Sequence, residues 1–251
     1  MTRFVLKGLN GSNPLGFMAS VGLLRLLNGQ MGRDAKLGFT EDGAFHAWIE
    51  CDPALNIEGL IANDAIGAAG TQPWRLEYEK TEKNGTKIVS DLKAPPEVFS
   101  EFLTEAISEW ILGRSEHADY AAAYGTDVAF DGKLNTKPTA FHFTAANQQF
   151  LGAVEGTRNI VTQEWVQRSL HFPGQTIPGP NLRWDPDAER SRALMGVNPK
   201  EDGTVVNAPL EWLAFRGLPS FRCFPVGDRI VTSGVTGRRQ DEMQFHWPLW
   251  S

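Results

Sequence analysis

The sequence predicts an α+β fold with mixed, mainly antiparallel strands and hairpins packed with several amphipathic helices. Apolar residues alternate over two short stretches on either side of Asp42-Gly43, which is a strong hairpin signal. Apolar residues recur at helical spacing over residues 14–28 and again after Pro96. A strand-helix-hairpin unit at the N-terminus is followed by a more irregular, aromatic-rich C-terminal half. Together these observations favour strands and helices that share one core.

Length and composition predict a single α+β domain of residues 1–251, and any subdivision is expected near residues 113–136. The chain has 251 residues, of which 41% are hydrophobic, as is ordinary for a globular protein with a core. No apolar run approaches the roughly 20 residues that are needed to cross a bilayer. The N-terminus does not resemble a secretory signal, because charges and turn residues interrupt its apolar positions. We therefore expect a cytoplasmic protein without membrane contacts.

Charge and cysteine content exclude some classes of function. The formal net charge of −6 argues against a protein that coats nucleic acid on its own, because such proteins usually carry a basic excess. A local basic patch remains compatible with this charge. Cys51 and Cys223 lie far apart in the sequence and share no metal-ligand spacing, so we expect two reduced core thiols.

The first third of the chain predicts four elements in order. Phe4 to Leu9 is typical of a strand, and Asn13 is a candidate N-cap for a helix that starts at Pro14 and runs to about residue 28. The hairpin around Asp42-Gly43 follows, over residues 36–51. Asp52-Pro53 is expected to open a helix that runs to about residue 69.

The remaining elements are predicted with the same rules. Residues 74–78 and 86–89 are expected to pair around a charged turn, and an amphipathic helix is expected from Pro96 to Gly113. Helices are also expected at residues 115–125 and, after the cap Thr162, at 163–170. Strands are expected at residues 221–224 and 229–233. The aromatic C-terminus, residues 245–250, is expected to dock on the body of the protein.

The central segment, residues 136–154, contains the first group of candidate site residues. We expect a short strand with Phe141 and Phe143 on one face and His142 on the other, followed by a helix that Thr144 caps. Polar residues early in this helix can bind a polar partner, because amides donate and accept hydrogen bonds without titrating. These residues are Asn147, Gln148 and Gln149.

Each of these candidates also has a structural interpretation. His142 is more often a half-buried histidine with a satisfied ring nitrogen than a base or a ligand. The three polar residues could equally form a solvated face or tether a loop. The sequence leaves both alternatives open.

Arginines form the second group of candidates. Arg183, Arg190 and Arg192 surround three acidic residues, and structural ion pairs are favoured over a metal site there because calcium-loop spacing is missing. A guanidinium fork can also grip phosphate. Arg238 and Arg239 follow a small, flexible loop that is the best local candidate for touching a phosphate backbone, although a solvated hairpin tip is the simpler interpretation.

The chain lacks the common catalytic motifs. It contains no phosphate-binding loop of the G-x-x-x-x-G-K-[ST] type, no G-x-G-x-x-G turn, no G-x-S-x-G elbow and no H-E-x-x-H helix. We expect no cofactor and no metal, and a binding or assembly protein rather than an enzyme. The alternative is a metal-dependent nuclease or hydrolase that uses His142 with Asp119, Asp185 or Asp187. A small-molecule binding protein, with a pocket lined by tryptophans, is a third hypothesis.

Three parts of the chain resemble a known family. GLNGSNPLGFMASVGLLRLL at residues 8–27, KPTAFHFTAANQQFL at 137–151, and LEWLAFRGLP with the closing FHWPLW resemble the small proteins of type I-G (formerly I-U) CRISPR loci, including an extension family of the helicase-nuclease. The opening segment is also similar to the N-terminus of the type I-G large subunit. These segments come from both ends and the middle of the chain.

The resemblance implies a non-enzymatic accessory or effector-complex subunit in crRNA-guided antiviral defence. In such systems base pairing recognises the target, while protein subunits hold the nucleic-acid backbone or recruit a nuclease. The implied partners are effector-complex proteins or the helicase-nuclease, with crRNA or DNA held at a local basic patch. The five arginines would then contact phosphate, and His142 with the three polar residues of the central segment would contact nucleic acid or a neighbouring subunit.

Overall fold

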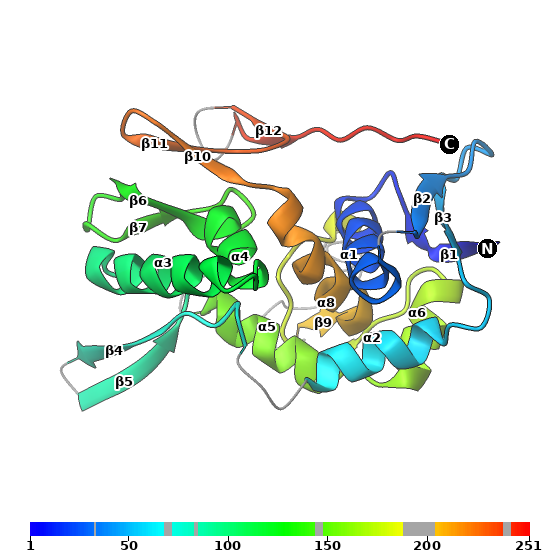
Figure 1. The fold of residues 1–251 in the computed structure, drawn as a ribbon, viewed down its shortest axis with the longest axis horizontal. Helices are drawn as coiled ribbons and strands as arrows, with labels where there is room; N and C mark the ends of the chain where they lie inside the picture. The colour runs from blue at the N-terminus through cyan, green and yellow to red at the C-terminus, as the bar shows by residue number, and fades with distance from the viewer. Residues whose placement is uncertain (33, 68–71, 83–84, 144–147, 188–203, 238–241) are drawn as a thin grey trace, which may run out of the picture. The chain divides into compact units, whose positions relative to one another are not determined.

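The computed structural model describes the whole chain except residues 33, 68–71, 83–84, 144–147, 188–203 and 238–241. It has the α+β fold that the sequence predicts (Figure 1), and every strand pair among the described residues is antiparallel, where the sequence predicted mainly antiparallel pairs. The chain forms two compact units. Unit 1 comprises Met1–Ala69, Val154–Gly217 and Pro248–Ser251, and unit 2 comprises Gly70–Ala153 and Leu218–Trp247.

In its described part, unit 1 combines a three-stranded sheet, in the order β1-β3-β2, with the helices α1, α2, α6 and α8. A further helix, α5 (Phe150–Asn159), begins in unit 2 and continues into unit 1. The described elements that lie wholly in unit 1 are β1 (Thr2–Asn10), α1 (Pro14–Met31), β2 (Lys36–Phe39), β3 (His46–Cys51), α2 (Ile57–Ile66), α6 (Gln163–His171), β8 (Ile177–Pro178), β9 (Val205–Val206) and α8 (Ala208–Gly217).

Caps set the helix starts of unit 1. The Asn13 side chain accepts a hydrogen bond from the N–H of Leu15 at the start of α1, and Thr162 accepts one from Trp165 at the start of α6, so both predicted caps are confirmed. The prediction for α2 is wrong at its start. Asp52 accepts hydrogen bonds in a turn, and Asn56 is the residue that caps α2.

Helices α1 and α8 pack more extensively on each other than on any other described element. Figure 1 shows the two ribbons side by side. Glycines allow this approach, because a Cβ atom on Gly22 would overlap the carbonyl oxygen of Leu213, and one on Gly217 would overlap the carbonyl oxygen of Met18. The small residues of α1 therefore bring two backbones together rather than merely filling space.

Unit 2 is built from two-stranded sheets and helices that cover its aromatic core. Its described elements are β4 (Glu77–Glu82), β5 (Gly85–Ser90), α3 (Pro96–Ile111), α4 (Glu116–Tyr124), β6 (Gly125–Phe130), β7 (Thr136–Pro138), η1 (Leu218–Ser220), β10 (Cys223–Val226), β11 (Arg229–Thr232), β12 (Val235–Thr236) and β13 (Gln244–Phe245). Both predicted C-terminal strands are present as the hairpin β10–β11.

The central segment differs from its prediction. The strand β7 ends at Pro138, and residues 139–142 form a turn in which the N–H of His142 donates to the carbonyl oxygen of Thr139. Phe141 is buried, whereas Phe143 is 39% exposed, so the two rings do not share a buried face. The helix α5 begins at Phe150, later than expected, and the proposed cap Thr144 lies outside the described residues. The alternation at residues 141–143 is too short to select a strand over a turn.

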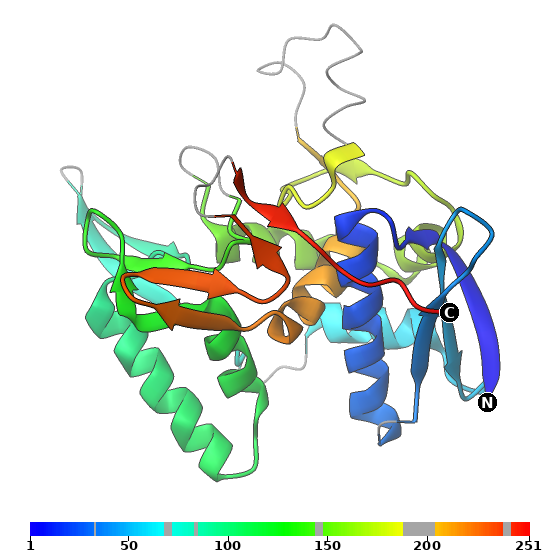
Figure 2. The same cartoon turned by 90° about the horizontal axis from the view of Figure 1, so that it is seen from above.

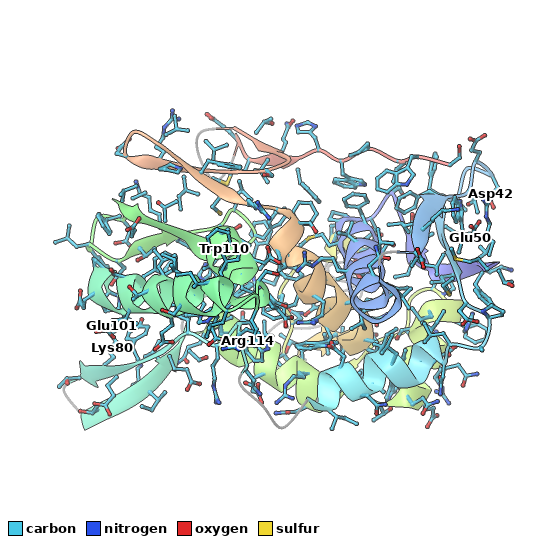
Figure 3. All side chains as sticks on the ribbon, viewed as in Figure 1. Asp42, Glu50, Lys80, Glu101, Trp110 and Arg114 are labelled. Carbon is cyan, nitrogen blue, oxygen red and sulfur yellow. The ribbon has the colours of Figure 1, made fainter. Side chains whose placement is uncertain are left out.

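The apolar side of α3 is buried over its first half only. Phe99 and Phe102 are buried, whereas Ile107, Trp110 and Ile111 are between 55% and 73% exposed. Figure 3 labels Trp110 and shows its side chain on the ribbon of α3. The helical spacing thus predicts the helix correctly but not how much of its apolar face another element covers.

The aromatic C-terminus packs as predicted. In unit 1 the Trp250 indole N–H donates to the carbonyl oxygen of Leu37 at 2.6 Å, and its ring lies edge-on to Phe39 with centroids 5.4 Å apart. In unit 2 the ring of Phe245 lies against Phe141. Phe245 and Trp250 therefore each belong to a packed aromatic group.

Both cysteines are buried free thiols, and burial raises the pKa of each. None of the described helices is long and apolar enough to span a membrane.

Glu211 is a buried carboxyl group in α8. It is 2% exposed, and its Oε2 accepts a hydrogen bond from the N–H of Leu182 at 2.7 Å. Burial raises the pKa of Glu211 to about 8, although the bond from Leu182 opposes the shift. The side chain is therefore mostly neutral at pH 7.

Replacing Gly22 by alanine should destabilise the protein, because the new methyl group meets the backbone of α8 rather than a movable side chain. We expect a loss of about 1–3 kcal/mol in the free energy of unfolding, measured with urea. The matched control is Gly29→Ala in the same helix, where an added Cβ atom would meet no described atom within 4 Å apart from its own helix backbone and chain neighbours. The control should stabilise the protein by about 0.5–1 kcal/mol through helix propensity. Equal effects of the two substitutions would contradict the packing argument.

Glu211→Gln should change how stability depends on pH. The pKa of Glu211 is about 8 in the folded protein, against about 4.3 in the unfolded chain. Its contribution is therefore complete below pH about 4 and is lost as pH rises towards 8. Glutamine retains an acceptor for Leu182, so the variant should lose less stability between pH 5 and 9, by an amount on the order of 3 kcal/mol. Urea unfolding across this range tests the difference, with the exposed Glu41→Gln as control; parallel curves for Glu211→Gln and the unsubstituted protein would refute it.

Candidate anion-binding pocket in unit 2

A pocket opens in unit 2 where the turn after β7 meets the hairpin β10–β11. Both figures show the β6–β7 pair next to this hairpin (Figures 1 and 2). The N–H of Ala140 donates to Thr232 Oγ1 at 2.9 Å, and Lys137 Nζ donates to the carbonyl oxygen of Asp228 at 2.6 Å. These bonds hold the turn against the hairpin and define one wall of the pocket.

The pocket has a volume of about 320 Å³ and is lined by three cationic side chains, Lys93, Lys137 and Arg229. None of its described lining residues is an aspartate or a glutamate. Lys93 and Arg229 are exposed, and Lys137 is half-buried. The lining favours an anion, because three cationic side chains border one cavity and no carboxylate is among the described residues of its wall.

His142 also lines this pocket, and its side chain pairs with a carboxylate. Its Nε2 lies 2.7 Å from Asp91 Oδ1, and the two side chains are 2% and 15% exposed. A carboxylate ion can only accept, so a hydrogen bond to it requires a proton on Nε2. The His142 ring also packs on Phe150, with centroids 5.4 Å apart. This is the buried histidine with a bonded ring nitrogen that the sequence offered as the structural alternative.

Asp91 holds together the loops next to the pocket. Its Oδ1 also accepts from the N–H of Leu92 at 2.8 Å and, at 3.4 Å, from the N–H of Phe150 at the first position of α5. One carboxylate thus connects the end of β5, the turn containing His142 and the start of α5. Its negative charge is also favourable at a helix N-terminus.

The polar triplet of the central segment is partly accounted for. Gln149 Oε1 accepts a hydrogen bond from the N–H of Ser90 at 2.8 Å, which ties the start of α5 to β5. This bond agrees with the loop-tethering interpretation of Gln149. Gln148 is half-buried next to it, and Asn147 lies outside the described residues.

Of the five arginine candidates, Arg183 is the one that lies within the described residues. Arg183 belongs to unit 1 and adopts a left-handed backbone conformation with φ 61°. Arg190, Arg192, Arg238 and Arg239 lie outside the described residues. Gly237 lines the cationic pocket, and Arg238 and Arg239 follow it directly in the sequence.

The acidic residues of the nuclease hypothesis have partners other than His142: Asp119 pairs with Arg222, and Asp185 and Asp187 accept from Asn13. Asp119 lies 3.4 Å from Arg222 in unit 2, whereas Asp185 and Asp187 belong to unit 1. The carboxylate paired with His142 is Asp91, which the sequence did not single out. Within the described ranges, no group of three or more His, Cys, Asp or Glu side chains is placed to hold a metal ion.

Sequence reasoning missed Lys93, Lys137 and Arg229. They stand in three segments separated by 44 and 92 positions in the sequence, so no local pattern joins them. Lys137 does lie inside the central segment, next to the proline that ends β7. Its position in this segment was the one available signal for the pocket. The sequence could not show that Lys137 meets Arg229, because that depends on how the hairpin β10–β11 packs.

Comparisons with known proteins do not add an assignment. No family model matches the chain, and no match was found among curated proteins or among solved structures.

Asp91→Asn should destabilise the protein by about 1–2 kcal/mol, because it replaces a hydrogen bond to a charged group with a neutral one at a buried pair. The free energy of unfolding in urea measures this loss. Asp127→Asn makes the same charge change at an exposed position of unit 2 and should stay within about 0.5 kcal/mol of the unsubstituted protein. Equal losses of unfolding free energy in the two variants would contradict the role of Asp91 in holding the loops next to the pocket.

Proposed function

We propose that this chain is a non-enzymatic accessory or effector-complex subunit that contacts the phosphate backbone of nucleic acid through unit 2. The observation that carries the proposal is the pocket lined by Lys93, Lys137 and Arg229, with no carboxylate among its described lining residues. Lysine and arginine provide most of the contacts by which proteins neutralise phosphates.

The pocket is suited to contacting nucleic acid at one place rather than along a continuous protein surface. The net charge of the chain is −6, so the whole protein does not attract a polyanion, and binding depends on the local arrangement of cations. Phe143 and Met243 also line the pocket and are each 39% exposed. An exposed aromatic ring beside cations is the combination that binds single strands, because bases stack on the ring while cations follow the backbone.

The proposed assembly, a CRISPR effector complex, is based on the sequence resemblance to type I-G CRISPR proteins. One of the three resembling segments, residues 137–151, supplies Lys137, His142 and Phe143 to the pocket. In this proposal the chain holds crRNA or displaced DNA beside effector-complex proteins or the helicase-nuclease. The paired and packed state of His142 supports a binding role for this segment.

The triple variant Lys93→Gln, Lys137→Gln and Arg229→Gln should bind single-stranded RNA or DNA less tightly than the unsubstituted protein. Each lost phosphate contact lowers the dependence of log affinity on log salt by about 0.7, so the slope should fall by about 2. Fluorescence anisotropy of a labelled oligonucleotide, measured at several salt concentrations, gives both quantities.

The matched control is Lys133→Gln, which removes a positive charge from an exposed position of unit 2 outside the pocket. The control should keep the affinity and the slope. The proposal is refuted if the triple variant keeps the affinity of the unsubstituted protein at every salt concentration.

Co-purification from the native cells, with and without nuclease treatment, tests the assembly. Recovery of CRISPR effector proteins or the helicase-nuclease that survives nuclease supports an adaptor held by protein contacts. Metal-dependent cleavage of nucleic acid by the purified chain, without such partners, would replace the adaptor by the nuclease alternative.

A further inference from the structure

Three large apolar side chains in the last five residues of α3 are exposed. Ile107, Trp110 and Ile111 are 55%, 62% and 73% exposed, and the half-buried Leu103 lies one turn before Ile107. Spacings of four and three residues place Leu103, Ile107 and Trp110 on one side of the helix. Figure 2 shows the C-terminal end of α3 projecting beyond the other described elements of unit 2. A contiguous group of large apolar side chains in such a position is typical of an interaction site.

The opposite flank of the exposed face of α3 is acidic. The helix contains four glutamates and no lysine or arginine in its 16 residues. Figure 3 labels one of them, Glu101, together with Trp110. Glu101 and Glu105 are one turn apart, exposed, and form no ion pair with a described residue. Arg114, which follows the helix, is engaged by Glu109, because its Nη2 donates to Glu109 Oε1 at 2.8 Å.

A ridge of small residues separates the apolar and acidic flanks. Ser100, Thr104 and Ser108 are exposed and follow one another at intervals of four residues. The hydroxyl groups of Thr104 and Ser108 donate to the carbonyl oxygens of Ser100 and Thr104, each at 2.9 Å, so these donors are satisfied within the helix. Small side chains let a second helix approach closely. A helix that lies along this ridge would contact the apolar side chains on one side and Glu101 and Glu105 on the other.

The charge of α3 selects among the possible occupants of this surface. A helix with an apolar face bordered by lysine or arginine complements both flanks. A second copy of α3 does not, because it brings four more glutamates, and the same charges repel nucleic acid and anionic membranes. The apolar side chains span little more than two helical turns, whereas two folded proteins usually bury about 800 Å² each, so the surface suits a single helical segment.

We infer that α3 is a docking site for a helical segment of another protein, in which basic residues border an apolar face. Trp110 is the anchor, because tryptophan is enriched among the residues that dominate binding energy. Glu101 and Glu105 pair with the basic residues and determine which partner binds. None of the described residues that line the cationic pocket belongs to α3, so this inference does not depend on nucleic-acid binding.

The test is fluorescence anisotropy of a labelled model peptide that is titrated with the full chain. The peptide is a helix of about 18 residues with leucines on one face and lysines beside them. In one control peptide glutamates replace the lysines, and in the other serines replace the leucines. We expect the original peptide to bind at least about tenfold more tightly than either control. If either control binds as tightly as the original peptide, or if the original peptide does not bind, the inference is overturned.

Variants locate the docking site. Trp110→Gln should weaken peptide binding at least about tenfold, and Ile111→Gln about fivefold. The matched control is Ile66→Gln, which changes the same exposed residue type at the last position of α2 and should not affect binding. Glu105→Gln should weaken binding and reduce its dependence on salt, unlike Glu79→Gln on the exposed side of β4. Equal losses in Ile111→Gln and Ile66→Gln would assign the peptide to another surface and overturn the inference.

Two further measurements test the other occupants. In sedimentation velocity, a dimer of the full chain that Ile111→Gln abolishes would assign the surface to a second copy. In sedimentation with phosphatidylcholine vesicles, binding that Trp110→Gln abolishes would assign it to a membrane. Either result overturns the inference, whereas a monomer that leaves the vesicles in solution and binds the lysine peptide supports it.

Discussion

The close approach of α1 and α8 is the constraint on which unit 1 depends. A Cβ atom at Gly22 or at Gly217 would overlap the backbone of the facing helix, so glycine at both positions sets the distance between them. Glu211 of α8 is buried, and its Oε2 accepts a hydrogen bond from the N–H of Leu182. The cap residues of the two helices, Asn13 and Asn207, line one pocket.

Unit 2 depends on a different kind of interaction. Asp91 is a single carboxylate that accepts hydrogen bonds from His142, Leu92 and the first residue of α5. It therefore fixes the turn that forms one side of the cationic pocket. Among the described lining residues, the pocket in unit 2 has three cations and no carboxylate, and the pocket in unit 1 has two carboxylates and no cation. The three cations of the unit 2 pocket can bind an anion locally even though the net charge of the chain is negative.

Local rules predicted the elements whose signals lie within a few residues. The caps Asn13 and Thr162 and the hairpin at Asp42-Gly43 are all confirmed, because capping and turn formation involve neighbours in sequence. The same rules failed at residues 139–150. A three-residue alternation of aromatic side chains suggested a strand there, but the partners that decide the conformation are Asp91 and Thr232, which are distant in sequence.

The sequence by itself determined the α+β class, most helix and strand positions, the free core thiols and the docking of the aromatic C-terminus, because periodicity, caps and hydrophobicity are local properties. Only the tertiary structure decided which charges meet. Lys93, Lys137 and Arg229 converge because β7 packs beside the β10–β11 hairpin, and Asp185 and Asp187 reach Asn13 across more than 170 positions of the chain. Electrostatic interactions act through space, so the spacing of charges along the chain does not reveal the pockets that those charges form.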